Sequence, residues 1–425
     1  MTPMRIALLL LACGATSLSA QTDAVLRANP TMTPAIRAML DTIKADNAWT
    51  LAQQKSICEI PAPPFHEAAR AREMQRRFVS LGYANARIDS IGNVIVERKG
   101  TGDWPKLVIA GHLDTVFPEG TNVKVKTAGT RMTAPGIGDD CRGLAVLLAV
   151  ARAYAKTKLA TTGAVYFVAN VGEEGPGNLR GTRYLFDHSL KGKIDAFITI
   201  DSPGDPGIAY HSVGSIRYKA TYRGPGGHSF GAFGTANPIH ALGRAIAAID
   251  ELTVPTSPKT TFNVGVISGG TSVNSIPFEG SAEIDMRSES ADELNRLNEK
   301  VLAALSAARD AENRRWNATD PAKQITLKLD TIGIRPANSD QTERTPIVLA
   351  ALNTAKQLGF TAALETSSTD ANYPMSLGIP AIRISGGGSG GNSHALPEWY
   401  DDGQQGWLGP QWAALLVAVI AGVKP

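Results

Sequence analysis

The sequence predicts an α/β fold in which a mostly parallel sheet carries helices on both faces. Continuous apolar runs are typical of strands buried on both sides, and they lie at 107–110, 163–170, 196–200 and 379–384. Helical patterns separate these runs, and strands that alternate with helices pair in parallel. Their carboxyl ends are therefore expected to meet at one edge of the sheet, where ligands bind in open α/β folds.

Length and composition are those of an ordinary globular protein. The chain has 425 residues, of which 43% are hydrophobic and 19% charged, and its formal net charge is +3. This length is enough for two domains with sizeable cores. The near-neutral charge balance gives no basic surface for nucleic acid, so we expect a folded protein without a nucleic-acid partner.

The first 20 residues have the pattern of an export signal peptide. Arg5 supplies a positive charge, 6–12 form an apolar core, and small residues lead to Ala20. That core is too short to span a bilayer, and no other segment is apolar enough to do so. The segment 10–13 also resembles a lipoprotein cleavage box with Cys13 as the lipidated residue. We therefore expect an exported protein, periplasmic or secreted, that is either soluble or anchored through Cys13.

Two cysteines, Cys58 and Cys141, remain after cleavage behind Ala20. An oxidising compartment would allow them to pair, but a disulfide also requires their Cα atoms to lie within reach of each other. Sequence spacing does not place these atoms, so both are treated as small buried apolar residues.

Local signals define the elements around the apolar runs. The proline-rich turn at 61–64 ends the first helical region, and a glycine-rich turn precedes the buried helix that follows the acid pair 139–140. Before residue 212, the further expected elements are helical segments over 21–60, 67–81 and 144–151 and a strand near 93–96.

The middle of the chain has a different pattern and predicts an inserted domain. Its strands alternate apolar and polar residues, as half-buried antiparallel strands do. The expected strands are 216–222, 281–287 and 325–332, and the expected helices are 238–252 and 291–316. The order β-α-β-β-α-β is that of a ferredoxin-like unit. We expect a catalytic domain at 21–212 and 336–425, interrupted by this lid or dimerisation domain at 213–335.

Acids and histidines follow the buried strands. His112 and Asp114 are two residues apart, so their side chains leave extended backbone on the same side. A carboxylate beside a histidine is typical of a metal ligand with its orienting acid, and a loop histidine beside a helix-capping aspartate is an equal alternative. The residues at the other strand ends and at the helix start are Asp139, Glu173, Glu174, Asp201 and His394. The acid pair at 139–140 can also be a helix cap.

This set of histidines and carboxylates without cysteine suits Zn²⁺, and Mn²⁺ or Co²⁺ are alternatives. A carboxylate-rich set with one acid free to bridge suits two ions. The reaction also needs a base that is not itself a ligand, and the adjacent Glu173 and Glu174 can supply one of each.

The motifs together resemble those of the M20 family of dinuclear zinc peptidases, near the peptidase T and glutamate carboxypeptidase branches. The matching segments are 111–115, 136–140, 172–175, Asp201, 226–229 and His394. The resemblance implies that His112 and Asp201 bind one zinc ion, that Glu174 and His394 bind the other, and that Asp139 bridges them. It also implies that Asp114 orients His112, that Glu173 is the general base acting on a water between the ions, and that the peptide bond between Asp139 and Asp140 is cis.

The family also implies roles for residues of the inserted domain. His228 would reach the active site of a partner subunit in a homodimer and stabilise the oxyanion, whereas a histidine in a glycine-rich loop is more often a turn residue. Asn274 and Arg287 match positions that hold the substrate, Arg287 through its carboxylate; a strand-end salt bridge is an equal explanation for Arg287.

The expected reaction is hydrolysis of the amide bond of a short peptide by an exopeptidase or a di- or tripeptidase. An N-acyl amino acid is the alternative substrate. A serine hydrolase using Ser389 is less favoured, because the nucleophile elbow must run from a strand into a helix and no helical pattern follows Ser389. A non-catalytic binding or scaffold protein is a further alternative. We do not favour it, because an acid that binds no metal, such as Glu173 beside the ligands, would have no function in such a protein.

Overall fold

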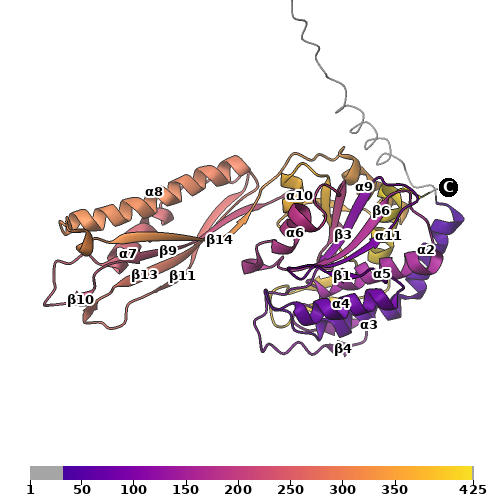
Figure 1. Cartoon of the computed structure of the whole chain (residues 1–425), viewed down its shortest axis with the longest axis horizontal. Helices are drawn as coiled ribbons and strands as arrows, with labels where there is room; N and C mark the ends of the chain where they lie inside the picture. The colour runs from indigo at the N-terminus through magenta and orange to yellow at the C-terminus, as the bar shows by residue number, and fades with distance from the viewer. Residues whose placement is uncertain (1–31, 424–425) are drawn as a thin grey trace, which may run out of the picture.

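The computed structural model describes residues 32–423 and shows a larger α/β lobe joined to a smaller, elongated lobe (Figure 1). The expected signal peptide, with Cys13, lies outside these residues. Among the helices that the structure describes, none has the length and apolar character needed to cross a membrane.

The larger lobe is built on an eight-stranded sheet that is parallel through its centre. In spatial order its strands are β1 (Arg87–Ile88), β2 (Val94–Arg98), β6 (Ala164–Asn170), β3 (Lys106–His112), β7 (Ala196–Ile200), β16 (Ala381–Ile384), β8 (Gly207–Ser212) and β15 (Ala363–Ser367). The pairs β6–β3, β3–β7, β7–β16 and β8–β15 are parallel, and the other three are antiparallel. The four buried runs are the central strands, as predicted. The sequence pattern did not indicate β8 or β15; of these, β15 is an edge strand with mostly exposed side chains.

Helices cover both faces of this sheet, which confirms the predicted fold class. Leu107 and Ile109 of β3 belong to one apolar core with α5, while Val108 and Ala110 belong to a second core on the opposite face, as the alternation of side chains along a strand requires. The helices of this lobe are α2 (Pro34–Ala45), α3 (Asn47–Cys58), α4 (Ala68–Ser80), α5 (Cys141–Thr157), η1 (Gly175–Gly177), α6 (Arg180–Tyr184), η2 (Leu185–Ser189), α9 (Pro346–Gln357), α10 (Asn372–Ser376) and α11 (Leu408–Ile420).

The smaller lobe is a four-stranded antiparallel sheet with two helices packed on one face. Its elements are β9 (Gly214–Arg223), β10 (Gly227–His228), α7 (Pro238–Asp250), β11 (Thr260–Gly269), β12 (Ser275–Ile276), β13 (Glu279–Ser288), α8 (Ala291–Arg315), η3 (Pro321–Lys323) and β14 (Thr326–Arg335). The spatial order β11-β13-β9-β14 is that of a ferredoxin-like unit. The sequence did not locate β11, since most side chains of this edge strand are exposed.

The chain enters and leaves the smaller lobe at neighbouring points. Ser212 precedes β9 and Asn338 follows β14, and their backbones exchange two hydrogen bonds of 2.8 and 3.3 Å. The chain thus crosses between the lobes at two adjacent positions. The carboxyl ends of the central strands and the near end of the smaller sheet therefore lie close to the same junction. A small sheet beside this junction contains β4 (Lys126–Ala128), β5 (Arg131–Thr133), β17 (Ser389–Gly391) and β18 (Trp399–Asp401).

Candidate metal centre

His112 is the last residue of β3, so the strand extends to the histidine instead of stopping at Gly111. Its side chain is 1% exposed, and its Nε2 lies 3.0 Å from Asp139 Oδ1. Burial alone would lower the pKa of His112, but contacts with Asp114 and Asp139 outweigh it and raise this pKa well above its usual value. The carboxylates therefore surround His112 with negative charge that a cation would neutralise.

Asp114 contacts both His112 and the residues that follow β6. The Nδ1 of His112 lies 3.0 Å from the backbone oxygen of Asp114 and 3.6 Å from its carboxylate. That carboxylate accepts the backbone N–H groups of Glu173 at 3.0 Å and Glu174 at 2.9 Å. One buried acid thus fixes the ends of both β3 and β6.

The two acids at 139–140 have different surroundings. Asp140 is the N-cap of α5: its carboxylate accepts the N–H of Gly143 at 2.9 Å and that of His112 at 3.0 Å. The carboxylate of Asp139 instead faces His112 and His394. The capping alternative therefore holds for Asp140 and not for Asp139. The peptide bond between them is cis, as the resemblance implied.

The side chains of Glu173 and Glu174 point to different partners. Glu174 Oε1 lies 3.1 Å from His394 Nε2. Glu173 Oε1 accepts a 2.8 Å hydrogen bond from Nη1 of Arg335, whose Nη2 also donates to the Glu173 backbone oxygen. Burial raises the pKa of Glu173 well above its usual value, and the charge of Arg335 offsets part of that effect. Glu173 is thus the acid of the pair that is not engaged with a histidine.

The structure brings the five predicted metal ligands together. Potential ligand atoms of His112, Asp139 and Glu174 lie within 4.8 Å of one another, as do those of His112, Asp140 and Asp201. His394, on the loop between β17 and β18, contacts both Asp139 and Glu174, and these contacts raise its pKa to about 10. Buried carboxylates gathered around two histidines are a donor set that fits divalent ions. The second group contains Asp140 in the place where the prediction had Asp139, although the Asp140 carboxylate is also engaged as the cap of α5.

Glu398, which the sequence analysis did not single out, shapes the loop that carries Asp139. Its carboxylate is buried and accepts three backbone N–H groups, from Gly136 at 2.9 Å, Gly138 at 2.8 Å and Asp139 at 2.9 Å. Burial raises the pKa of Glu398 to about 7. In the sequence Glu398 is marked only by its position shortly after His394. A single acid before an aromatic strand is common, so this position did not indicate a role in the site.

The predicted residues of the smaller lobe divide between two places. Arg287 lines the cavity beside the candidate metal ligands, with a volume of about 330 Å³. His228 and Asn274 do not line it. They lie together at the far end of the lobe, where β10 is labelled in Figure 1, and the Ser229 N–H donates to the Asn274 backbone oxygen at 2.9 Å. In one chain these two residues are therefore remote from the metal centre.

Ser389 and the two cysteines have no part in this centre. Ser389 begins the short strand β17, not a strand-to-helix turn, and it lines a different cavity from Glu173. Cys58 and Cys141 are both buried and free. The nucleophile-elbow alternative thus lacks the local geometry that it requires.

Comparison with known proteins identifies the family. The model of peptidase family M20/M25/M40 matches residues 108–407. Carboxypeptidase G2 of Pseudomonas sp. is 25% identical over 343 residues, which cover 75% of this chain and 76% of that protein.

Solved structures share the fold. Aminopeptidase PepT of Bacillus cereus superposes with a TM-score of 0.69 at 19% identity, covering 88% of this chain and 98% of the other. The YXEP protein of Bacillus subtilis, described as a dinuclear metal-binding peptidase, has a TM-score of 0.61 at 19% identity and covers 89% and 98%. The chain belongs to peptidase family M20/M25/M40 and is an enzyme of the metallopeptidase type.

Proposed function

We propose that this protein hydrolyses the amide bond of short peptides at a centre of two Zn²⁺ ions, with Mn²⁺ or Co²⁺ as alternatives. The observation that carries the proposal is the gathering of carboxylates around His112 and His394 beside Glu173, an acid outside the ligand set. His112 and Asp201 would hold one ion, Glu174 and His394 the other, and Asp139 both.

When bound, the two ions would polarise the scissile carbonyl and activate a water molecule for attack. Glu173 is placed to accept the proton of the attacking water on its carboxylate and to pass it to the leaving nitrogen. Burial favours this role, because it raises the pKa of Glu173 and so makes the carboxylate a stronger base. Asp114 keeps both glutamates in place through their backbone N–H groups.

The cavity limits the size of the substrate. A volume of about 330 Å³ at the junction of the two lobes suits a substrate with a free end and excludes a folded protein. Arg287 lies where it can bind a carboxylate of the substrate, although it also makes the ion pair with Asp285 that the alternative explanation expected. An N-acyl amino acid is the second candidate, since the same residues would cleave its amide bond.

Removal of metal is the first test of this proposal. We expect dialysis against a chelator to abolish hydrolysis of di- and tripeptides, because no side chain that lines the cavity can polarise the substrate carbonyl as strongly as a divalent ion does. Addition of Zn²⁺, Mn²⁺ or Co²⁺ should restore it, and a serine-reactive phosphonate should have no effect. Full activity after chelation, with loss on phosphonate treatment, would favour Ser389 instead.

Arg335 provides a second test through its contact with the proposed base. Arg335→Gln removes the charged hydrogen bond to Glu173, and such bonds contribute about 1.5–3 kcal/mol. Without Arg335 the Glu173 carboxylate loses a fixed position and the charge that keeps it ionised, so we expect kcat to fall about 10- to 100-fold, with a smaller change in KM. Arg183→Gln is the matched control, because Arg183 donates to Ile334 at the same junction but does not touch Glu173. An equal loss in both variants would mean that the effect comes from the junction and not from the base.

We further propose that the protein is an exported homodimer. Export rests on the charged and apolar pattern of residues 1–20. The dimer rests on the remote position of His228 and Asn274, which lie far from the metal centre of their own chain and would act on the site of another copy. Exposed apolar side chains surround this end of the lobe, with Phe230 89% and Val273 102% exposed, and such exposure is typical of a contact surface.

A further inference from the structure

Two cysteines follow the expected signal peptide, and the fold brings them together. Cys58 is the last residue of α3, and Cys141 is the first residue of α5. Both are 0% exposed and belong to the same apolar core, and the thiol of each is in hydrogen-bond contact with the thiol of the other. The structure thus places side by side two sulfur atoms that sequence spacing alone could not place.

A second contact joins the same two helix ends. Gln54 lies about one helical turn before Cys58, on the same face of α3. Its side-chain oxygen accepts a hydrogen bond of 3.3 Å from Nη1 of Arg142, the residue after Cys141. Gln54 and Arg142 are both buried. The end of α3 therefore packs directly on the first turn of α5, and the contact between the two thiols is part of that packing.

The two cysteines border the loop that carries Asp139. The Cys58 thiol donates to the backbone oxygen of Pro135 at 3.5 Å, and the Cys141 N–H donates to that of Gly136 at 3.2 Å. Elsewhere this loop is held by its three hydrogen bonds to a buried carboxylate. A covalent link between α3 and α5 would therefore fix the loop of the predicted bridging ligand on the side that faces α3.

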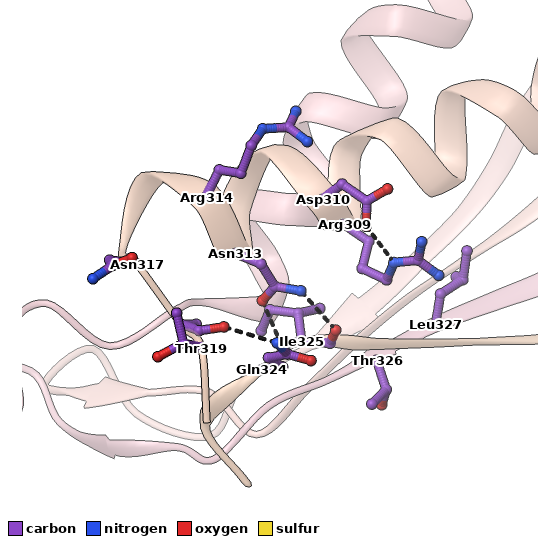
Figure 2. A pocket seen from close by; sticks show the side chains of 11 residues that line it. Arg309, Asp310, Asn313, Arg314, Asn317, Thr319, Gln324, Ile325, Thr326 and Leu327 are labelled. Atoms are coloured by element: carbon purple, nitrogen blue, oxygen red, sulfur yellow. Dashed lines mark hydrogen bonds and ion pairs between the residues drawn. The ribbon is translucent and has the colours of Figure 1, made fainter. Parts of the chain in front are cut away.

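The polar groups around a hollow in the smaller lobe have no comparable unused chemistry. This hollow measures about 590 Å³ and lies between the end of α8 and the start of β14. Figure 2 shows that its polar groups satisfy one another: Arg309 pairs with Asp310 at 2.8 Å, and Asn313 makes two hydrogen bonds to the backbone of Ile325. Arg314 points away from the other side chains.

The thiol pair, in contrast, has a reaction open to it. The structure holds both thiols in the reduced form. Neighbouring thiols are converted to disulfides in oxidising compartments and stay reduced in reducing ones. Because both sulfur atoms are buried, exchange with an oxidant would take place while the chain folds, before the core encloses them. Once formed, the bond would be shielded from thiols in solution.

We propose that Cys58 and Cys141 are joined by a disulfide bond in the exported protein, and that this bond braces the loop of Asp139 against α3. An S–S bond forms between the two Sγ atoms, the S–S bond of a disulfide-exchange oxidant breaks, and the two thiol protons pass to the sulfur atoms of that oxidant. The bond depends on the proposed export and not on the proposed hydrolysis, since a reducing compartment would keep the thiols free.

A count of free thiols tests the bond in the wild type. The full chain, with residues 1–20 in place, is expressed in a bacterium and recovered from the periplasm or the medium. A maleimide added in denaturant labels free thiols, and mass spectrometry counts the labels. We expect no label on Cys58 or Cys141 before reduction and a label on each after it, with the two cysteine peptides linked in the unreduced digest. Protein made in the cytoplasm without residues 1–20 is the matched control and should be labelled on both without reduction.

Refolding makes the test independent of export. Protein recovered from the cytoplasm is unfolded and refolded with oxidised glutathione, and we again expect Cys58 and Cys141 to be linked to each other. Labelled thiols in the exported or refolded protein, or linkage of either cysteine to another molecule, would overturn the proposal. Recovery of the chain only from the cytoplasm, with the bond formed on refolding, would refute export and keep the pairing.

Thermal unfolding measures what the bond contributes. Reduction should lower the melting temperature of the oxidised wild type by roughly 5–10 °C. Cys58→Ala, Cys141→Ala and the double variant should all melt close to the reduced wild type, because either substitution removes the whole bond. The double variant is the control for the reductant and should not respond to it. Losses that add in the double variant, or no shift on reduction, would mean that the two residues only fill the core, and amide hydrolysis would stand in either case.

Discussion

Replacement of Glu173 by alanine is expected to lower kcat about 10²- to 10⁴-fold, the usual contribution of a general base. Metal content should not change, because Glu173 contacts Arg335 and no candidate metal ligand other than its neighbour in sequence. The measurement is steady-state hydrolysis of a dipeptide together with metal analysis of the purified protein.

The variant Glu173→Gln distinguishes loss of the proton acceptor from loss of the side chain's size and hydrogen bonding. The amide oxygen of glutamine can still accept the hydrogen bond from Arg335, but it cannot take a proton from water. The two variants should therefore be impaired to a similar degree, and both should keep the melting temperature of the wild type within a few degrees. Wild-type turnover in Glu173→Gln would rule out Glu173 as the base.

The polar residues at strand ends were predictable because topology places them. Consecutive buried strands separated by helices pair in parallel, so residues that follow β3, β6 and β7 must reach the same edge of the sheet. Strand topology alone therefore groups His112, Glu174 and Asp201, without any knowledge of their side-chain contacts. Asp139 and His394 come from two loops, and it was the family motifs that predicted them; the structure places them in contact with each other.

The supporting contacts were not predictable from sequence, because they join residues whose separation follows no pattern. Glu398 holds the loop of Asp139 from 259 residues away, and Arg335 reaches Glu173 across 162 residues. Only the packing of the two lobes shows that Arg335 shares a cavity with the proposed base.

His228→Ala is expected to lower kcat about 10²- to 10³-fold, as loss of an oxyanion-stabilising group does. The structure places His228 at the far end of the smaller lobe, with its Nδ1 accepting the N–H groups of Phe230 and Gly231 at 3.2 Å. This loop contact leaves Nε2 as the nitrogen free to act on the site of another copy. The measurement is kcat of the variant, with its oligomeric state determined by light scattering.

Complementation distinguishes action on a partner from action within one chain. In a heterodimer of Glu173→Ala with His228→Ala, one site combines an intact Glu173 with the intact His228 of the other chain, and the second site lacks both. Heterodimers isolated through two affinity tags should therefore recover about half of the wild-type activity, since one of the two equivalent sites is complete. A heterodimer of Glu173→Ala with Asp139→Ala is the control and should stay inactive, because each chain spoils its own site. Failure of the first pair to recover, or a monomeric wild type, would mean that His228 does not serve a neighbouring subunit and that its place in the glycine-rich loop reflects the turn alone.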